Sequence, residues 1–140
     1  MIECARLAPR AVVYGTDLDP QAIAVAASNF AAAGLSAAAQ HLQVMSCLDF
    51  RAASPTLTIT NPPMGKRVHR GTLEPIIVGF VEAWLALAPA GGRLVWLSPL
   101  PQITDVLFSK AGCRVDFRGA VDLGGFEAQL EVIVKLVDLA

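Results

Sequence analysis

A short segment, TNPPMG at residues 60–65, carries groups that could hold an amine for methyl transfer. An exocyclic amine on a nucleobase is a poor nucleophile because its lone pair is delocalised into the ring. The side-chain oxygen of Asn61 and the rigidly directed carbonyl of Pro62 can each accept one N–H. They would fix the amine and turn its lone pair toward an incoming methyl group. Gly65 would let the backbone approach a base closely.

The same letters also occur in ordinary turns, because Asn-Pro commonly opens one. The context favours the enzymatic interpretation. Residues 56–60 (TLTIT) are typical of a buried strand, and Pro62 and Pro63 forbid its further pairing. An upstream apolar run at residues 11–16 predicts a second strand, which ends at Asp17. In open α/β sheets, ligands bind at the carboxyl ends of such strands.

The other segments alternate between helical and strand patterns. A helix is expected from Asp19-Pro20 to Gly34, with Asp19 as its cap and a buried face formed by Ile23, Ala27, Phe30 and Ala31. Further strands are expected at 41–45 and 93–98, helices at 73–88 and 102–111, and a strand pair at 113–118 and 127–136 around Gly124-Gly125. Trp84 and Trp96 occupy predicted core positions. The order predicts one α/β domain over residues 1–140 with a three-layer sheet.

Composition narrows the class of protein. Fifty-four per cent of the 140 residues are apolar and the net charge is −1. Because the chain as a whole is not basic, any contact with nucleic acid must come from a local cluster of basic residues. The candidate is the basic cluster Lys66, Arg67, His69 and Arg70, directly after the motif. Three scattered cysteines suggest neither a metal site nor a disulfide framework and favour the cytoplasm. No signal peptide or membrane span is expected.

Three segments together resemble the methyltransferase domain of the THUMP-associated RNA guanine-N2 methyltransferases, within the amino methyltransferases that carry an N/D-P-P-aromatic motif. TNPPMGKRV is similar to that family's TNPPYGxRL, and YGTDLDPQAIAVAASNFAAAG is similar to YGsDiDpxaixxAxxNaxxAG, including Asn29 and Ala33-Gly34. GGRLVWLSP and the late hairpin also fit. The resemblance implies a Rossmann-like class I methyltransferase sheet with helices on both faces and a C-terminal β-hairpin.

The resemblance also implies roles for individual residues. S-adenosylmethionine would be the cofactor, with its ribose hydroxyls held by Asp17. The target would be a base amine in tRNA or rRNA, most simply N2 of guanine, with Lys66, Arg67 and Arg70 contacting the RNA. The expected amine site comprises Asn61, Pro62, Pro63 and Met64, and the expected cofactor contacts are Asp17, Leu18, Ser46, Cys47 and Asn61.

Three departures from the family pattern stand out. Met64 occupies the usual aromatic position, where its polarisable thioether would cover a base more weakly. Ser46 stands where an Asp usually contacts the adenine, with Asp49 three residues on. Residues 1–5 (MIECA) resemble the helix that follows the family's glycine-rich loop, so the first strand and that loop are expected to be missing. A preceding segment, or a THUMP-like RNA-binding domain, would complete the protein.

Alternatives stay open at this stage. N6-methylation of adenine would use the same amine geometry. A truncated, non-catalytic domain could bind RNA or protein instead, and the missing loop is its main support. The remaining possibility is an α/β domain that binds another nucleotide. The sequence context of the NPP motif argues against it.

Overall fold

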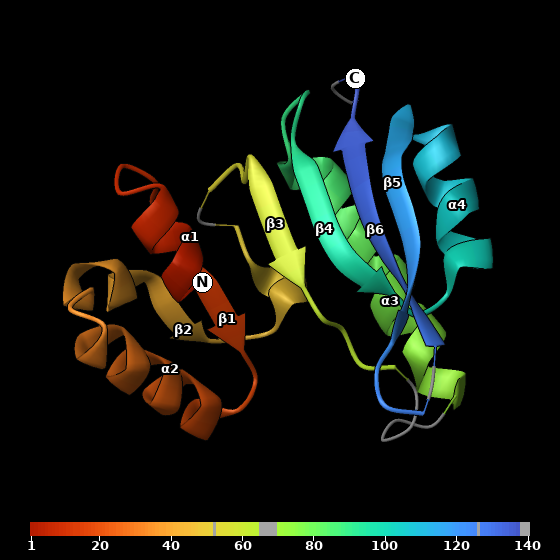
Figure 1. The fold of residues 1–140 in the computed structure, drawn as a ribbon. Coiled ribbons are helices and arrows are strands. Elements are labelled where there is room, and N and C mark those ends of the chain that lie inside the picture. The colour runs from red at the N-terminus through yellow and green to blue at the C-terminus, as the bar shows by residue number, and fades with distance from the viewer. Residues whose placement is uncertain (52, 65–69, 126, 138–140) are drawn as a thin grey trace. The chain divides into compact units, whose positions relative to one another are not determined.

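A computed structural model of the chain describes residues 1–51, 53–64, 70–125 and 127–137 (Figure 1). The chain divides into two compact units, Met1–Phe50 and Arg51–Ala140. None of the described helices is long and apolar enough to cross a membrane.

The first unit is a small two-stranded parallel sheet with helices. Gly15 of β1 pairs with Leu42 of β2, and Asp17 pairs with Val44. Its elements in order are α1 (Ile2–Leu7), β1 (Gly15–Asp17), α2 (Pro20–Ala32), η1 (Ser36–His41), β2 (Leu42–Val44) and η2 (Cys47–Asp49).

Helix α2 begins and ends as predicted. The side chain of Asp19 accepts a 2.9 Å hydrogen bond from the backbone N–H of Gln21, and Pro20 is the first helical residue. Gly34 follows the helix with a φ of 72°, a left-handed conformation that glycine adopts without strain. Phe30 is buried, as expected, whereas Ala31 is exposed, so that part of the predicted face was wrong.

The strands of the first unit are shorter than predicted. Pairing begins at Gly15 rather than Ala11, and Val12 is 63% exposed. The reason is that β2 has only three residues to offer as partners, and apolar character alone does not make a strand without a hydrogen-bonded neighbour. The segment between α2 and β2 contains the short helix η1.

The second unit contains a four-stranded mixed sheet in the order β3-β4-β6-β5. β3 and β4 are parallel, whereas β6 runs antiparallel to both β4 and β5. Its elements are β3 (Leu57–Thr60), α3 (Arg70–Leu87), β4 (Arg93–Ser98), α4 (Pro101–Lys110), β5 (Cys113–Asp122) and β6 (Glu127–Lys135). The bounds of β4 agree with the prediction, and the others differ by a few residues.

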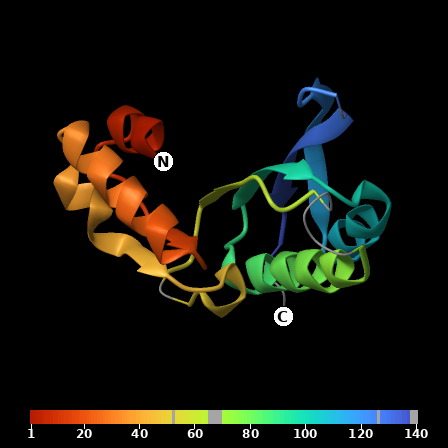
Figure 2. The same cartoon turned by 90° about the horizontal axis from the view of Figure 1, so that it is seen from below.

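The core of this unit lies between the sheet and the helices α3 and α4 (Figure 2). Leu94, Trp96 and Ser98 alternate along β4 and are all buried, which marks the side of the sheet that the helices cover. Trp84 and Trp96 are buried, as predicted, and both pack edge-on against Phe108 of α4.

The C-terminal hairpin joins β5 to β6, as predicted. Asp122 holds the turn by accepting hydrogen bonds of 2.9 and 3.0 Å from the backbone N–H groups of Gly124 and Gly125, both of which have positive φ. The register of the pair shifts between Val115 and Phe117, where a bulge accommodates Asp116. β5 extends to Asp122, four residues beyond the predicted end.

Candidate active-site residues

The NPP motif leaves the carboxyl end of β3, which is where a ligand-binding loop is expected. Thr60 is the last residue of the strand and is paired with Trp96 of β4. Asn61 and Pro63 are exposed, and Pro62 and Met64 are half-buried. The chain has left the sheet here, so the amide of Asn61 is available to a ligand.

The predicted RNA-contacting residues are only partly described. Lys66 and Arg67 lie outside the described residues, as do Gly65 and His69. Arg70 is the first residue of α3. The motif is therefore followed, within a few residues, by the start of the long helix that carries the core.

Asp17 ends β1 and is exposed. Its Oδ1 atom accepts a 2.9 Å hydrogen bond from the backbone N–H of Asp19, two residues on. This local bond fixes the direction of the carboxylate at the carboxyl end of the strand. Leu18, the next residue, is 73% exposed and offers an apolar surface beside the carboxylate.

The chain after β2 reaches the same edge of the small sheet. The backbone N–H of Met45 donates to the carbonyl of Asp17 at 2.9 Å, so the Ser46–Cys47 pair follows directly beside the end of β1. The hydroxyl oxygen of Ser46 accepts a 3.2 Å hydrogen bond from Leu48 N–H and caps η2. Within this unit, the fold thus brings the predicted cofactor residues Asp17, Leu18, Ser46 and Cys47 together.

Cys47 and Asp49 differ in what they offer. Partial burial of its thiol raises the pKa of Cys47, so the group is protonated and uncharged near neutral pH. Asp49 is the last residue of η2 and is exposed. The segment that follows β2 therefore presents the hydroxyl of Ser46, the neutral thiol of Cys47 and the carboxylate of Asp49.

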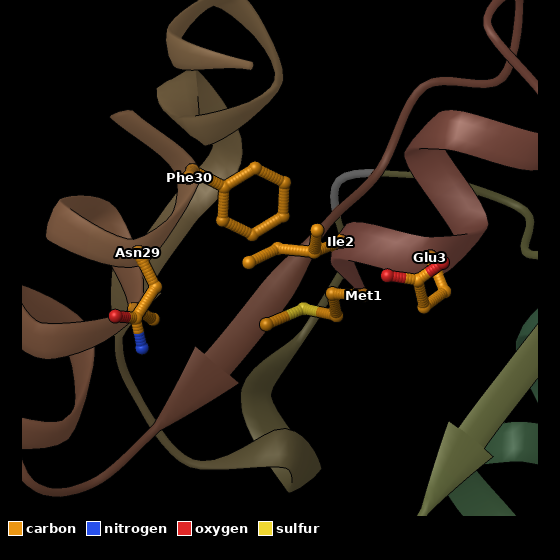
Figure 3. Close-up of a pocket in the computed structure, with 6 residues that line it drawn as sticks. Met1, Ile2, Glu3, Asn29 and Phe30 are labelled. Atoms are coloured by element: carbon orange, nitrogen blue, oxygen red, sulfur yellow. The ribbon is translucent and has the colours of Figure 1, made fainter. Parts of the chain in front are cut away.

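Two cavities in the first unit lie away from these residues. One, of about 310 Å³, is lined by Met1, Ile2, Glu3, Ala26, Asn29 and Phe30 (Figure 3). Another, of about 340 Å³, lies near Val12, Leu35 and His41. Neither contains Asp17, Ser46 or Cys47. The first is framed by Met1, whose sulfur lies so close to β1 that a Cβ on Gly15 would come within 2.7 Å of it.

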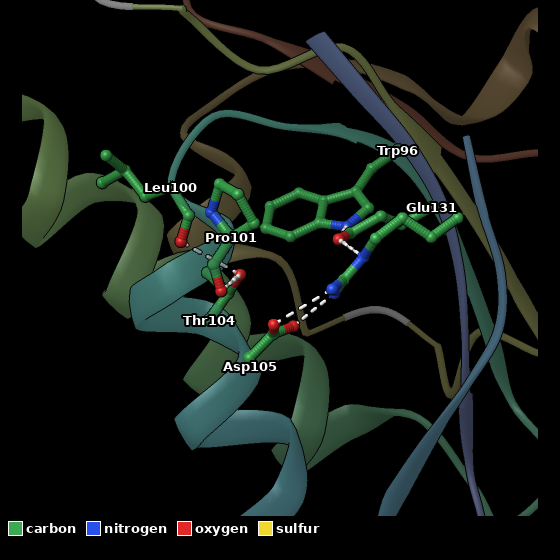
Figure 4. Close-up of polar contacts among 7 residues, drawn as sticks. Trp96, Leu100, Pro101, Thr104, Asp105 and Glu131 are labelled. Carbon is green, nitrogen blue, oxygen red and sulfur yellow. Dashed lines mark hydrogen bonds and ion pairs between the residues drawn. The ribbon is translucent and has the colours of Figure 1, made fainter. Parts of the chain in front are cut away.

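A polar cluster in the second unit was not anticipated from the sequence (Figure 4). Glu131 is fully buried, accepts a 3.0 Å hydrogen bond from the indole N–H of Trp96, and lies 2.7 Å from the Nε of Arg118. The two terminal nitrogens of Arg118 bind both carboxylate oxygens of Asp105 on α4. Pairing with Asp105 is also the main cause of the raised pKa of Arg118. The cluster links β4, β5, β6 and α4. Its member Trp96 is the strand partner of Thr60.

The described residues contain no group of three or more His, Cys, Asp or Glu side chains placed to hold a metal ion. The polar side chains at the ends of β1 and β2, those of Asp17 and Ser46, each accept a local hydrogen bond from a backbone N–H.

Comparison with known proteins agrees with this arrangement. Residues 2–98 match the family model described as RMKL-like, methyltransferase domain. No curated protein matches the chain. Among solved structures, TrmN from Thermus thermophilus is 27% identical with a TM-score of 0.77, covering 96% of this chain and 40% of that one.

More distant structures share the fold. The ribosomal protein L11 methylase from Lactobacillus delbrueckii subsp. bulgaricus is 17% identical, with a TM-score of 0.71, over 96% of this chain and 63% of that one. An rRNA methylase from Streptococcus thermophilus is 15% identical, with a TM-score of 0.62, over 89% and 73%. The chain spans well under two thirds of the TrmN structure. It belongs to the RMKL-like methyltransferase domain family and has the Rossmann-like α/β fold of class I methyltransferases.

Proposed function

We propose that the complete protein transfers a methyl group from S-adenosylmethionine to an exocyclic amine of a base in RNA, with N2 of guanine in tRNA or rRNA as the favoured target. The observation that carries the proposal is the position of Asn61 and Pro62, which leave the sheet at the carboxyl end of β3 in a chain of methyltransferase fold.

The amine clamp works by orientation rather than by strong base catalysis. S-adenosylmethionine supplies the methyl group on a sulfonium, which is already an activated donor. Asn61 accepts one N–H of the target amine through its side-chain oxygen, and Pro62 accepts the other through its carbonyl. Met64 covers one face of the base. These contacts would direct the nitrogen lone pair at the methyl carbon, at a separation of about 3 Å. The N–C bond would form as the S–C bond breaks, S-adenosylhomocysteine would leave, and the methylated nitrogen would lose one proton to water.

The first unit fits a role in holding the cofactor. A carboxylate at the end of a strand is a suitable acceptor for ribose hydroxyls, and Asp17 is exposed and held in one direction by Asp19 N–H. Leu18, Ser46 and Cys47 would contact the adenosine. A neutral thiol at Cys47 suits an uncharged adenine better than a thiolate would.

The choice of RNA rests on the resemblance of TNPPMGKRV to the guanine-N2 family. Lys66, Arg67 and Arg70 would hold phosphates beside a base that is flipped out of its helix. Free cysteines at positions 4, 47 and 113 are compatible with the cytoplasm, where we place the reaction.

A preceding segment with a strand, a glycine-rich loop and a THUMP-like RNA-binding domain would complete this protein. The chain spans 40% of the TrmN structure, which supports the idea. By calorimetry, residues 1–140 alone should bind the cofactor weakly or undetectably, whereas tight stoichiometric binding would contradict this part.

The test of function uses the complete gene product and tritium-labelled S-adenosylmethionine. The acceptor is tRNA and rRNA from a strain in which the gene is deleted, and the product is identified by nucleoside mass spectrometry. N2-methylguanosine is the expected product. Detection of N6-methyladenosine would support the amine clamp but identify adenine, not guanine, as the target base. A protein that binds the RNA and transfers no methyl group would favour the non-catalytic alternative.

A further inference from the structure

Ser98, the last residue of β4, has a buried hydroxyl group that the fold leaves without a partner. Its side chain is 3% exposed, and its Oγ makes no hydrogen bond among the described residues. A buried polar group without a partner costs folding free energy, and such groups are uncommon in native structures. The indole N–H of Trp84 is also unpaired, but Trp84 belongs to the helix core, whereas Ser98 lies at a strand end.

The register of the sheet places Ser98 at the edge from which the NPP motif leaves. Thr60, the last residue of β3, is paired with Trp96 of the parallel strand β4, two residues before Ser98. Neighbouring strands lie about 4.8 Å apart. β3 ends at Thr60 whereas β4 continues for two residues beyond the partner of Thr60, so Ser98 and the start of the NPP motif share one edge of the sheet.

The backbone that carries Ser98 is held firmly. Trp96, two residues earlier on the same face, is bound by the buried carboxylate of Glu131. On its other side, Ser98 itself is paired with Gln129 of β6. A hydroxyl on such a strand has a well-defined position. Pro62 has no partner in the sheet, so a hydrogen bond from that hydroxyl could fix the direction of its carbonyl.

We propose that Ser98 is a positioning residue for the amine clamp, and the idea rests on the function proposed above. A carbonyl oxygen has two lone pairs. When the target amine occupies one lone pair of the Pro62 carbonyl, the Ser98 hydroxyl donates to the other and fixes the carbonyl's direction. The serine does not touch the reacting atoms. Its unpaired hydroxyl is a cost to the free protein that is recovered in the substrate complex.

This role predicts opposite effects on rate and stability. Ser98→Ala removes an unpaired buried hydroxyl, so the melting temperature should stay the same or rise. The single-turnover rate of methylation should fall by roughly three- to tenfold, the worth of one hydrogen bond, with RNA affinity unchanged. Ser98→Cys keeps a side chain of similar size with a weaker donor, and its rate should fall in between.

Thr104 of α4 supplies the matched control. Its hydroxyl is also fully buried, but it donates to the carbonyl of Leu100 at 3.2 Å. Thr104→Val removes a hydrogen bond already made in the free protein, so the melting temperature should fall while the rate per folded molecule is kept.

The experiment measures melting temperature, RNA affinity by filter binding, and single-turnover methylation for the complete gene product and these variants. A slower Ser98→Ala enzyme of undiminished melting temperature supports the proposal. Parental methylation by Ser98→Ala overturns it, as does a loss of rate that merely follows a loss of stability. If the unmodified protein methylates no base amine, the proposed function itself has failed, and this inference fails with it.

Discussion

Trp96 donates its indole N–H to the carboxylate of Glu131 across the β4–β6 pair, at 3.0 Å, with both side chains buried. The Nε of Arg118 lies 2.7 Å from the other carboxylate oxygen of Glu131. The pair is the inner part of a cluster that ends at Asp105 on α4.

Arg118→Ala should therefore destabilise the second unit strongly. Removing one partner of a buried ion pair costs roughly 3–5 kcal/mol. Arg118 keeps part of its guanidinium in water, so we expect about 2–3 kcal/mol, read from the urea midpoint at constant slope. Arg114→Ala is the control, because its ion pair with Asp116 is exposed and should have no measurable effect. Equal urea midpoints for the two variants would show that Glu131 does not depend on Arg118.

Asp17→Ala should weaken cofactor binding and removes one exposed hydrogen bond, from Asp19 N–H, from the fold. Loss of a charged acceptor for the ribose hydroxyls is worth about 1.5–3 kcal/mol, measurable by calorimetry on the complete gene product. Asp19→Ala is the matched control two residues away. It removes the cap of α2, which costs about 1 kcal/mol of folding stability, and should leave cofactor affinity nearly unchanged. Unaltered affinity in Asp17→Ala would exclude the ribose role.

Cys47 should react slowly with iodoacetamide although the residue is exposed. Burial of its thiol raises the pKa, so less thiolate is present at pH 7–8 than in free cysteine, and the rate should rise at higher pH than for the free amino acid. Saturating S-adenosylmethionine should slow the reaction further in the complete gene product if Cys47 contacts the cofactor. Alkylation of Cys47 that is unaffected by saturating cofactor would remove this residue from the cofactor site.

Lys66 and Arg67 should contribute to RNA affinity through phosphates rather than bases. Replacing both with Ala should weaken binding to all acceptor RNAs by a similar factor. It should also reduce the salt dependence of the logarithmic binding constant by about 0.7–0.9 per lost contact. Filter binding at several salt concentrations provides the measurement. An unchanged slope would mean that neither side chain contacts a phosphate.

Local signals allowed much of the fold to be predicted from the sequence. Asp19-Pro20 and Gly34 marked the ends of α2, and Gly124-Gly125 marked the hairpin, because capping and turn chemistry act over a few residues. The strand leading to Asn61 was recognisable for a similar reason, since two prolines end its pairing.

Features that depend on distant partners were missed. Val12 looks like a strand residue but has no described neighbour to pair with, so β1 starts later. Glu131 and Lys135 look like solvent-facing positions of β6, yet both are buried. The Nζ of Lys135 donates to the carbonyls of Leu85 and Ala88 at the end of α3. Sequence patterns show charge but not the partner, about 50 residues away, that allows the charge to be buried. Ser98 was missed for a similar reason, because the burial of its unpaired hydroxyl depends on distant parts of the chain.

The clamp itself is tested most directly by Asn61→Ala in the complete gene product, with single-turnover methylation and filter binding of the acceptor RNA measured side by side. Loss of an orienting acceptor should slow methylation by about 100-fold, while phosphate contacts keep RNA affinity close to the parental value. Asn61→Asp should be milder, because a carboxylate still accepts the amine N–H. Methylation by Asn61→Ala at the parental rate, or an equal loss of RNA binding and rate, would contradict the clamp and leave the motif as a turn.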